Sequence, residues 1–597
     1  MNDDYNAFIQ NTFGNYTYNN LADFYANNKP GAYSVGYPLV DDKKDETTKA
    51  AAKFKTMRLA AFINDEFRPN ENLTLNFAIR ADKFSFITDL ATDQFTNDSA
   101  LAKFSQYYDL HGARSGQKPD IKLSVSPRVG FTYRIPDQKI TVRGGVGLFT
   151  GRIPLVWPAA IYNNNGLFQG SFTANSSQNA AALNTIRFRP DPNNQWRASD
   201  VGITLSKGGL NLISKEFKLP KVFRMSLGFD RQLGNGWSTT VEGLFTKNIN
   251  EIYYTNINIL PPVGTSLGPG ARSVYPLTLL IPIRSNGTNP YDNTILLINN
   301  EGKKGYSYNI TFTIDKRFQK GLAVNANYSY GESVTLNEGT SSVNLSQWRF
   351  METVNGRNFI DRSISDFSPG HKITAFISKR FEYARKTFAT TVSLFYTGQS
   401  GAPFSFVYQQ GSGSNPGPVR DDPTGGNDLI YIPTASELQA QTFISNTVGS
   451  TTYTPQQQKD ALETYIQNNK YLRTHRGQFA DRNGVRLPFT HVIDLKIAQD
   501  FNVKVSRRVI SFQVTWDVFN FTNMLNRNWG RTYFLTNDNL TVINFFGYVN
   551  STTNFTPQYK FNPTLAQPNS LANLSSGNAA PIFNPRWTSQ IGLRLNF

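Results

Sequence analysis

The residue types that carry out most enzymatic chemistry are scarce and scattered in this sequence. Cysteine is absent, which excludes disulfides, thiol nucleophiles and cysteine-based zinc sites. The four histidines are dispersed, and none has a metal-ligand spacing such as His-x-x-x-His. The glycine-rich run 144–147 lies inside a predicted strand and opens no helix, so it is not a nucleotide-binding loop. We find no catalytic constellation and predict that the chain is not an enzyme.

Three aspartates around one tight turn are the best candidates for a metal site. Asp421, Asp422 and Asp428 surround a Pro-Thr-Gly-Gly turn, and hard carboxylate oxygens on such a loop suit calcium. Their spacing does not match an EF-hand, and aspartate is also a common turn residue. Calcium in this surface loop is one hypothesis and ordinary turn chemistry is the other. No further cofactor is predicted.

The elements that would position these residues show the period-two pattern of β-strands. From Lys122 to Ile135, for example, aliphatic and aromatic side chains alternate with polar ones. By this test the chain contains about 13 strands of roughly 9–12 residues, the length that crosses a bilayer. The predicted strands begin near Met57, Leu73, Lys122, Ile140, Val222, Trp237, Tyr306, Leu322, Lys372, Thr387, Phe489, Val509 and Trp587.

The connections between these strands alternate between short and long. Tight turns are predicted at 68–72, 136–139, 234–236, 319–321, 382–386 and 502–508. Between them lie loops of roughly 35 to 90 residues, which is unusual for a compact soluble domain. Short turns on one rim and long loops on the other are typical of bacterial outer-membrane barrels. We therefore predict an all-β fold, a transmembrane antiparallel β-barrel in the outer membrane, with short periplasmic turns and long extracellular loops.

One of these loops is predicted to contain a helix. Thr454 followed by Pro455 is typical of a helix N-cap and first turn. Apolar residues then recur at helical spacing from Ala461 to Leu472. We expect this helix to pack on its loop neighbours.

The strands also divide into a charged face and an apolar face. A charge at mid-depth of a bilayer costs about 2–4 kcal/mol, so charged side chains should face a polar lumen and apolar ones the lipids. The predicted lumen-facing residues are Arg80, Arg128, Arg143, Arg224, Glu242, Asp315, Asp494 and Asp517. The net charge of +17 would also suit nucleic acid, but the basic residues cluster at turns instead of forming a block. We expect outer-membrane lipids, and no nucleic acid, as partners.

Strand direction indicates that these strands do not close a barrel alone. The first strand, at Met57, and the last, at Trp587, both run toward the short-turn rim. They would pair in parallel, whereas a closed antiparallel barrel needs at least one more strand. The segment Ala7–Tyr18 is the candidate for part of it. Residues 1–56 are thus predicted to hold a partial strand and an extracellular loop, and residues 57–597 the barrel strands.

The final segment carries the sharpest motif in the chain. Gln590, Gly592, Leu595 and the terminal Phe597 resemble the C-terminal β-signal that the outer-membrane assembly machinery reads. The apolar residues from Trp587 to Phe597 share one parity, which would be the lipid face. We expect this strand to be an assembly signal, with that machinery as a partner.

Four stretches resemble recurring motifs of TonB-dependent receptors of the Bacteroidetes type, particularly the Oar-like group. They are Phe62–Leu75 (FINDEFRPNENLTL), Thr141–Pro154 (TVRGGVGLFTGRIP), Gly426–Pro433 (GNDLIYIP) and Asp517–Asn526 (DVFNFTNMLN). Singly each motif is weak, but they are spread in order along nearly the whole chain. The resemblance implies a barrel of about 22 strands whose lumen is filled by an N-terminal plug.

On this interpretation the chain holds roughly the last 13 or 14 strands of such a barrel. The signal peptide, the plug and the TonB box are then expected to lie outside it. The implied function is energised uptake of an oligosaccharide, a peptide or a chelate, with TonB contacting the missing N-terminal region. A surface lipoprotein lid is a further partner that the sequence does not identify. Two alternatives stay open: a passive porin-like channel, and a surface adhesin or structural barrel.

Overall fold

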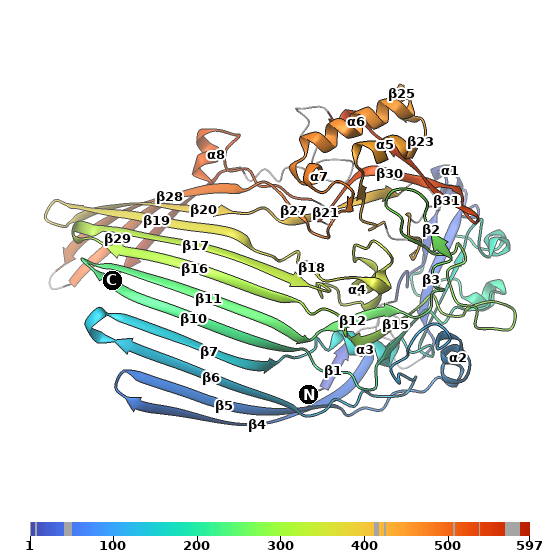
Figure 1. The fold of residues 1–597 in the computed structure, drawn as a ribbon, viewed down its shortest axis with the longest axis horizontal. Helices are drawn as coiled ribbons and strands as arrows, with labels where there is room; N and C mark the ends of the chain where they lie inside the picture. Colours follow the sequence, from blue (N-terminus) through green and yellow to red (C-terminus); the bar gives the residue numbers. More distant parts are fainter. Residues whose placement is uncertain are drawn as a thin grey trace.

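One large β-sheet and a mass of smaller elements at one end of it make up the structure (Figure 1). This computed structural model describes residues 2–5, 9–40, 50–410, 417–422, 426–505, 508–535, 538–566 and 586–596. Within these residues no helix combines the length and the apolar character needed to cross a membrane.

Among the described residues, the large sheet contains 15 strands, all paired antiparallel. In pairing order they are β1 (Asn2–Tyr5), β4 (Ala52–Asn70), β5 (Leu73–Phe86), β6 (Ser124–Ile135), β7 (Ile140–Thr150), β10 (Lys221–Gly234), β11 (Trp237–Asn250), β16 (Tyr306–Arg317), β17 (Leu322–Thr335), β19 (Gly370–Tyr383), β20 (Phe388–Gln399), β28 (Thr490–Val505), β29 (Arg508–Phe519) and β32 (Thr588–Asn596), with β18 (Ser363–Ile364) beside β17. Every strand predicted from the alternation is present, so the prediction of an antiparallel β-fold is confirmed.

The turns at one rim are as short as the sequence indicates. Between β10 and β11, Asn235 and Gly236 have φ values of 48° and 77°. Two consecutive positive φ angles are what a two-residue hairpin turn of the right twist requires, and Asn-Gly supplies them readily. We call this end of the sheet the short-turn rim and the opposite end the loop rim.

The connections at the loop rim fold into helices and small sheets. The helices are α1 (Leu21–Tyr25), α2 (Leu101–Phe104), α3 (Val156–Asn163), α4 (Asn344–Arg349), α5 (Ala435–Ala440), α6 (Pro455–Asn468), α7 (Lys470–Thr474) and α8 (Phe521–Leu525), and helical turns of other types are η1 (Thr96–Ala100), η3 (Ala180–Asn184), η4 (Ala198–Val201), η6 (Arg357–Phe359) and η8 (Pro563–Ala566), with η2 (Pro136–Gln138) and η5 (Gln319–Gly321) in short-rim turns. The predicted loop helix is confirmed as α6, whose N-cap Thr454 accepts a hydrogen bond from Gln457 N.

The small sheets join segments from different loops. They are β2 (Asn15–Thr17), β3 (Ala32–Pro38) and β8 (Gln169–Ala174); β12 (Ile252–Asn256), β15 (Asn293–Asn299) and β9 (Gly209–Ile213); β13 (Gly264–Thr265) and β14 (Ser273–Val274); β23 (Thr442–Phe443), β31 (Asn554–Phe561), β30 (Asn539–Asn550), β21 (Pro403–Gln410) and β27 (Val485–Arg486); β22 (Tyr431–Ile432) and β26 (Gln478–Phe479); and β24 (Asn446–Val448) and β25 (Thr451–Tyr453).

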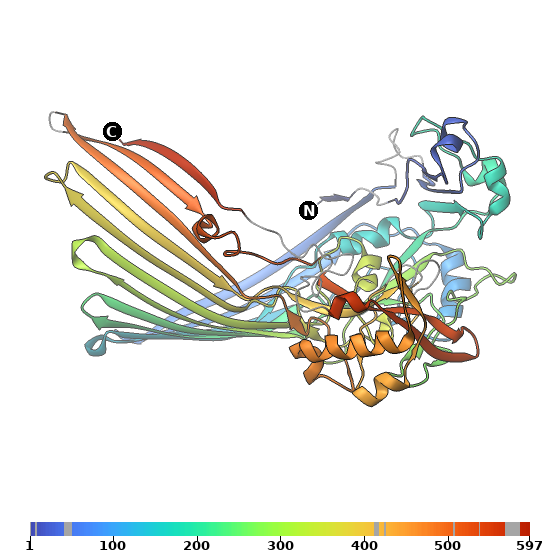
Figure 2. The same ribbon diagram turned by 90° about the horizontal axis from the view of Figure 1, so that it is seen from above.

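These loop elements have hydrophobic cores of their own. One core packs Phe404 and Phe406 of β21 against Leu462 of α6 and Phe545 of β30, each at most 2% exposed. Further cores gather around Tyr275, Tyr291 and Tyr33. The loops therefore form one folded mass, called the loop assembly below, at one end of an open, curved sheet (Figure 2).

The two edges of the sheet correct one expectation. The strand that pairs with β4 on its free side is β1, with Asn2 opposite Lys55 and Tyr5 opposite Ala52. The segment Ala7–Tyr18 was the predicted partner, and this prediction is wrong for its described part. That part contributes β2, which pairs with β3 in the loop assembly, because its aromatic residues pack there. β4 itself begins at Ala52, somewhat before the predicted Met57.

Candidate functional site

The eight charged residues predicted to face a lumen lie on one face of the large sheet. The registers connect them across the strands: Arg80 is opposite Ser126, Arg143 is opposite Gly228, and Asp494 is opposite Phe395. Following the pairing from β5 to β29 gives all eight the same parity. We call this surface the polar face. Among the described residues, no further strands face this surface to close a lumen around it.

The polar face carries an ion network that spans three strands, in the half of the sheet nearer the short-turn rim. Arg143 of β7 contacts Asp230 of β10 at 3.0 Å and Glu242 of β11 at 3.2 Å. The three side chains are 36–42% exposed, so water screens these pairs and each contributes little stability. Nearby, the guanidinium carbons of Arg128 and Arg224 lie 4.3 and 5.7 Å from the Phe149 ring centroid. The network fixes polar side chains across the face.

Other charges on this face are also paired, often with residues that sequence reasoning did not single out. Asp82 binds Arg58 and Arg80, each at 2.9 Å, and Lys496 binds Asp517 at 2.7 Å. Asp315 accepts a hydrogen bond from Ser238 at 2.5 Å. The alternation of side chains along each strand could have predicted these partners, because a residue directly across from a charged residue on the next strand lies on the same face of the sheet. Positive and negative side chains are paired on this face, so neither charge predominates along it.

The opposite face of the sheet is apolar and exposed. Ile310 and Phe312 of β16 are 54% and 42% exposed, and Ile591 and Leu593 of β32 are 73% and 71% exposed. The registers place these residues on the parity opposite to Asp315 and Asp517. Water would not favour so much contiguous apolar surface, whereas hydrocarbon would. We call this the apolar face.

The predicted assembly signal lies on the last strand of the sheet. Gln590 is opposite Asp517, Gly592 is opposite Thr515, and Leu595 is opposite Phe512. Leu595 is on the apolar face and 58% exposed. Phe597 lies outside the described residues. The role of these residues in assembly stays a prediction.

The three candidate calcium ligands are held by arginines. Asp421 accepts a hydrogen bond from the Arg357 backbone N–H at 2.6 Å and forms an ion pair with the Arg357 guanidinium. Asp422 forms an ion pair with Arg349 at 2.5 Å. Asp428 accepts Val419 N at 3.1 Å. Within the part of the chain that the structure describes, no group of three acidic or histidine side chains is arranged to hold a metal ion. This geometry gives the calcium hypothesis no support, because guanidinium groups already neutralise two of the carboxylates.

These aspartates and arginines form a buried link between two loops. Arg357 and all three carboxylates are about 1% exposed, and Arg349 and Arg357 come from the β17–β19 connection. Burial raises the pKa of Asp428 to about 6, although the nearby Arg357 charge opposes the shift. The pKa of Asp421 is raised for the same reason. Buried charges are tolerated only when paired, so this cluster fixes how the two loops pack.

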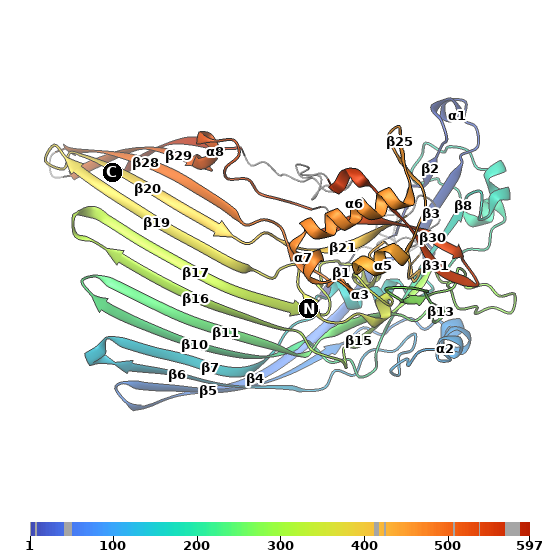
Figure 3. The ribbon, with the colours of Figure 1, turned by 45° about the horizontal axis from the view of Figure 1, so that its top comes forward.

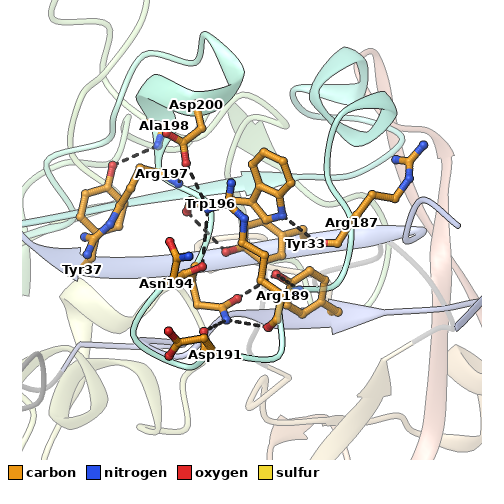
Figure 4. A network of polar contacts seen from close by, with 12 residues as sticks. Tyr33, Tyr37, Arg187, Arg189, Asp191, Asn194, Trp196, Arg197, Ala198 and Asp200 are labelled. Atoms are coloured by element: carbon orange, nitrogen blue, oxygen red, sulfur yellow. Dashed lines mark hydrogen bonds and ion pairs between the residues drawn. The ribbon is translucent and has the colours of Figure 1, made fainter. Parts of the chain in front are cut away.

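The part of the loop assembly around β3 and η4 contains two cation–π contacts (Figure 4). The guanidinium carbon of Arg189 lies 3.7 Å from the Trp196 ring centroid, and that of Arg197 lies 4.2 Å from the Tyr37 ring centroid. Asp200 pairs with Arg189 at 3.4 Å and accepts the Arg197 backbone N–H at 3.0 Å. Arg189 therefore covers one face of the half-buried Trp196 ring, so that face is not available for stacking on a ligand.

Two other loop tryptophans are also structural. Trp157 and Trp348 are 9% and 2% exposed, and their Nε1 groups donate to Ser341 O and Asn358 Oδ1. An exposed aromatic ring in a loop offers a flat apolar surface that can stack against a sugar or a peptide group. Trp529, at 53% exposed, is the loop tryptophan that fits that description.

A cavity of about 500 Å³ lies where the polar face meets the loop assembly. Arg58 and Phe84 line it from β4 and β5, and Arg152, Leu155 and Leu219 line it from loops. Arg58 is engaged by Asp82, whereas Arg152 is exposed. The cavity combines apolar walls with a cation, which suits an amphiphilic anion.

A family model described as "Outer membrane beta barrel domain" matches residues 1–563. No curated protein matches the sequence. Among solved structures, the siderophore receptor PirA from Pseudomonas aeruginosa has 10% identity and a TM-score of 0.31, covering 82% of this chain and 49% of that one. The ferric citrate transporter FecA has 9% identity and a TM-score of 0.34, covering 95% and 50%. The copper transporter OprC has 8% identity and a TM-score of 0.36, covering 88% and 52%. The chain spans about half the length of each of these three proteins.

Proposed function

The chain belongs to the outer membrane beta-barrel domain family, and we propose that it is the barrel portion of a receptor that imports a ligand with energy supplied through TonB. The observation that carries this proposal is the folded loop assembly at one rim of a membrane-type sheet. A passive pore needs only an open lumen, whereas a receptor needs a preorganised surface that captures its ligand. Buried cores and the Arg357–Asp421 pair supply that preorganisation here.

The polar face is proposed to line the lumen and the apolar face to contact lipid. Placing the polar face against lipid would expose Arg143, Asp230 and Glu242 to hydrocarbon, where a cation costs up to about 2–4 kcal/mol and an anion somewhat less. It would also leave Ile310 and Leu593 in a water-filled lumen. The assignment with the polar face inward avoids both costs.

The edges of the sheet favour a barrel larger than these strands can close. β4 and β32 run in the same direction, because an even number of antiparallel steps separates them in the pairing order. They cannot pair antiparallel with each other, and β1 pairs with only the first residues of β4. An unpaired edge in lipid leaves backbone groups without hydrogen bonds. We propose that further strands complete the wall and that a plug domain fills the lumen.

The ligand is proposed to be an oligosaccharide, a peptide or a chelate. The loop assembly would bind it from outside, and TonB would act on the part of the receptor that carries the plug. The 500 Å³ cavity beside Arg58 and Arg152 is large enough for part of such a ligand.

Conductance of the full-length receptor in a planar bilayer tests the proposal. A plugged receptor gives no steady open pore, whereas a passive channel gives a stable conductance in every insertion. In cells, accumulation of a labelled mixture of short peptides and oligosaccharides should require both this protein and TonB. A steady pore, or accumulation that survives deletion of TonB, would contradict energised import. Surface binding without any accumulation would indicate an adhesin.

A further inference from the structure

Helix α8 and the segment after it lie against the wall of the barrel. Figures 1 and 3 show α8 beside the ends of β28 and β29, apart from the other loop helices. Segment 526–533 continues from α8 and reaches the apolar side of β20 and β28, where both contribute to one notch. This loop therefore meets the lipid-contacting face at the loop rim.

The notch has a volume of about 330 Å³ and an aromatic floor. Tyr396 of β20 and His491 of β28 form the floor, joined by a hydrogen bond of 2.8 Å between Tyr396 Oη and His491 Nδ1. Their parity is that of Ile493, on the apolar face. Trp529 and Arg531, from the segment after α8, line the notch from above. Its walls are thus built from both the sheet and the loop.

The cationic group of the notch has no acidic partner in the described part of the chain. Arg531 donates hydrogen bonds to Asn528 and to Arg527 O, which are both uncharged acceptors. None of the ion pairs among the described residues includes Arg531 or Arg527. A guanidinium group in this state presents a planar set of donors that matches a phosphate. The notch therefore favours an anion over a cation or a neutral group.

The notch lies at the depth of lipid headgroups. An equivalent pair, Tyr328 and His371, occupies the same end of β17 and β19, again with a 2.8 Å hydrogen bond. At the other end of β19, Phe381 and Tyr383 are 50% and 46% exposed on the apolar face. About ten residues at roughly 3.4 Å each, on a strand tilted by about 40°, separate these bands by roughly 25 Å along the membrane normal. That is the height of the apolar band of an outer-membrane barrel, with aromatic residues at both borders.

The surroundings of the notch suit an acyl chain. Ile493 lies in the notch, and Leu495 and Ile497 follow it down the same face of β28. Met524 and Leu525 of α8 are 37% and 59% exposed, and Trp529 is 53% exposed. A free anion would gain nothing from these apolar groups, whereas a lipid would bury them with its tail.

We propose that this notch binds the phosphate-bearing headgroup of an outer-leaflet lipid. Arg531 holds the phosphate, Trp529 and the Tyr396–His491 pair pack against the rest of the headgroup, and the acyl chain follows the apolar face past Ile493. The bound lipid anchors the α8 loop to the membrane surface. This inference rests on the position of the sheet in the membrane and is independent of the transported ligand.

Native mass spectrometry of the full-length protein in detergent tests the proposal with two matched lipids. Dioleoyl phosphatidic acid and dioleoylglycerol share their tails and differ by the phosphate. We expect the phosphatidic acid to bind at least about tenfold more tightly, the ratio that one charge-assisted hydrogen-bond pair supplies. Inorganic phosphate alone, at millimolar concentration, should neither bind measurably nor displace the lipid.

Variants locate the effect. Arg531→Gln should abolish the preference for phosphatidic acid, and Arg531→Lys should restore part of it. Arg527→Gln is the matched control, because Arg527 has the same charge on the same segment but does not line the notch. Heat-modifiable gel migration verifies that each variant is folded. Equal binding of both lipids, equal loss in Arg527→Gln, or binding of inorganic phosphate in place of the lipid would each overturn the proposal.

Discussion

Apolar side chains of the large sheet point outward, whereas those of the loop assembly point inward. Ile310 of β16 is 54% exposed, but Phe406 of β21 and Phe545 of β30 are completely buried. Charged side chains follow the same contrast: Arg143 on the polar face is 41% exposed, and Arg357 in the loops is buried. The sheet is built for contact with lipid on one face, and the loop assembly is built like a water-soluble domain. Each region should therefore respond differently to the same type of substitution.

The largest difference is expected from the buried charge cluster. Replacing Arg357 with alanine leaves Asp421 charged and buried without its partner, which costs about 3–5 kcal/mol. The loop assembly should lose its protection from hydrogen exchange, while the sheet keeps its heat-modifiable migration. Arg473→Ala, at an exposed loop position, is the control and should change stability by less than about 0.5 kcal/mol. If the sheet unfolded together with the loops, the two regions would not be separate units.

The second prediction applies the same charge to both faces of one strand. Phe312→Arg places a cation on the apolar face of β16, which costs about 2–4 kcal/mol near mid-depth. Thr311→Arg places it on the polar face and should cost less than about 1 kcal/mol. Denaturant titration of the protein folded into bilayers gives both values. Equal costs would reject the assignment of the two faces.

The third prediction concerns the pH response of the loop assembly. The pKa of Asp428 is about 6 in the folded state, above the usual value of about 3.9 for an unfolded chain. The folded loops therefore bind the proton on the Asp428 carboxyl more tightly than the unfolded chain does. The stability that this proton contributes is fully present below about pH 4 and is lost as the pH rises through about 6. Loops should be more stable at pH 4.5 than at pH 7, by about 2 kcal/mol. The rate of loop proteolysis at the two pH values measures this difference, and Asp428→Asn should reduce it. If the ratio of the two rates is the same in the variant, Asp428 is not its source.

The smallest effect is expected on the polar face. Glu242→Gln weakens the contact with Arg143, but these side chains are half-exposed, so stability should fall by less than about 1 kcal/mol. The same denaturant titration measures it. A loss as large as that of Arg357→Ala would mean that the polar face is dry.

The two regions also differ in how far the sequence predicts them. The strands of the sheet could be predicted because lipid imposes a period of two on every strand, and α6 could be predicted from the local signal of Thr454 and Pro455. The pairing of Arg357 with Asp421, 64 residues away, has no local signal. Nor does the pairing of β3 with β8, which joins the N-terminal segment to the β7–β10 loop. Loop contacts depend on distant partners, and periodicity does not encode them.

A cysteine scan along β16 and into the loop assembly tests the central contrast most directly. The chain has no cysteine, so each single substitution provides one labelling site. From Tyr306 to Arg317, a polarity-sensitive probe should alternate with a period of two, and brominated lipids should quench it at Ile310 and Phe312 but not at Thr311 and Thr313. At Phe406 and Phe545, which are buried in the folded loops, a cysteine should not react with a water-soluble maleimide until the loops are unfolded. Uniform quenching along β16, or rapid labelling at the two loop sites in the folded protein, would contradict the account.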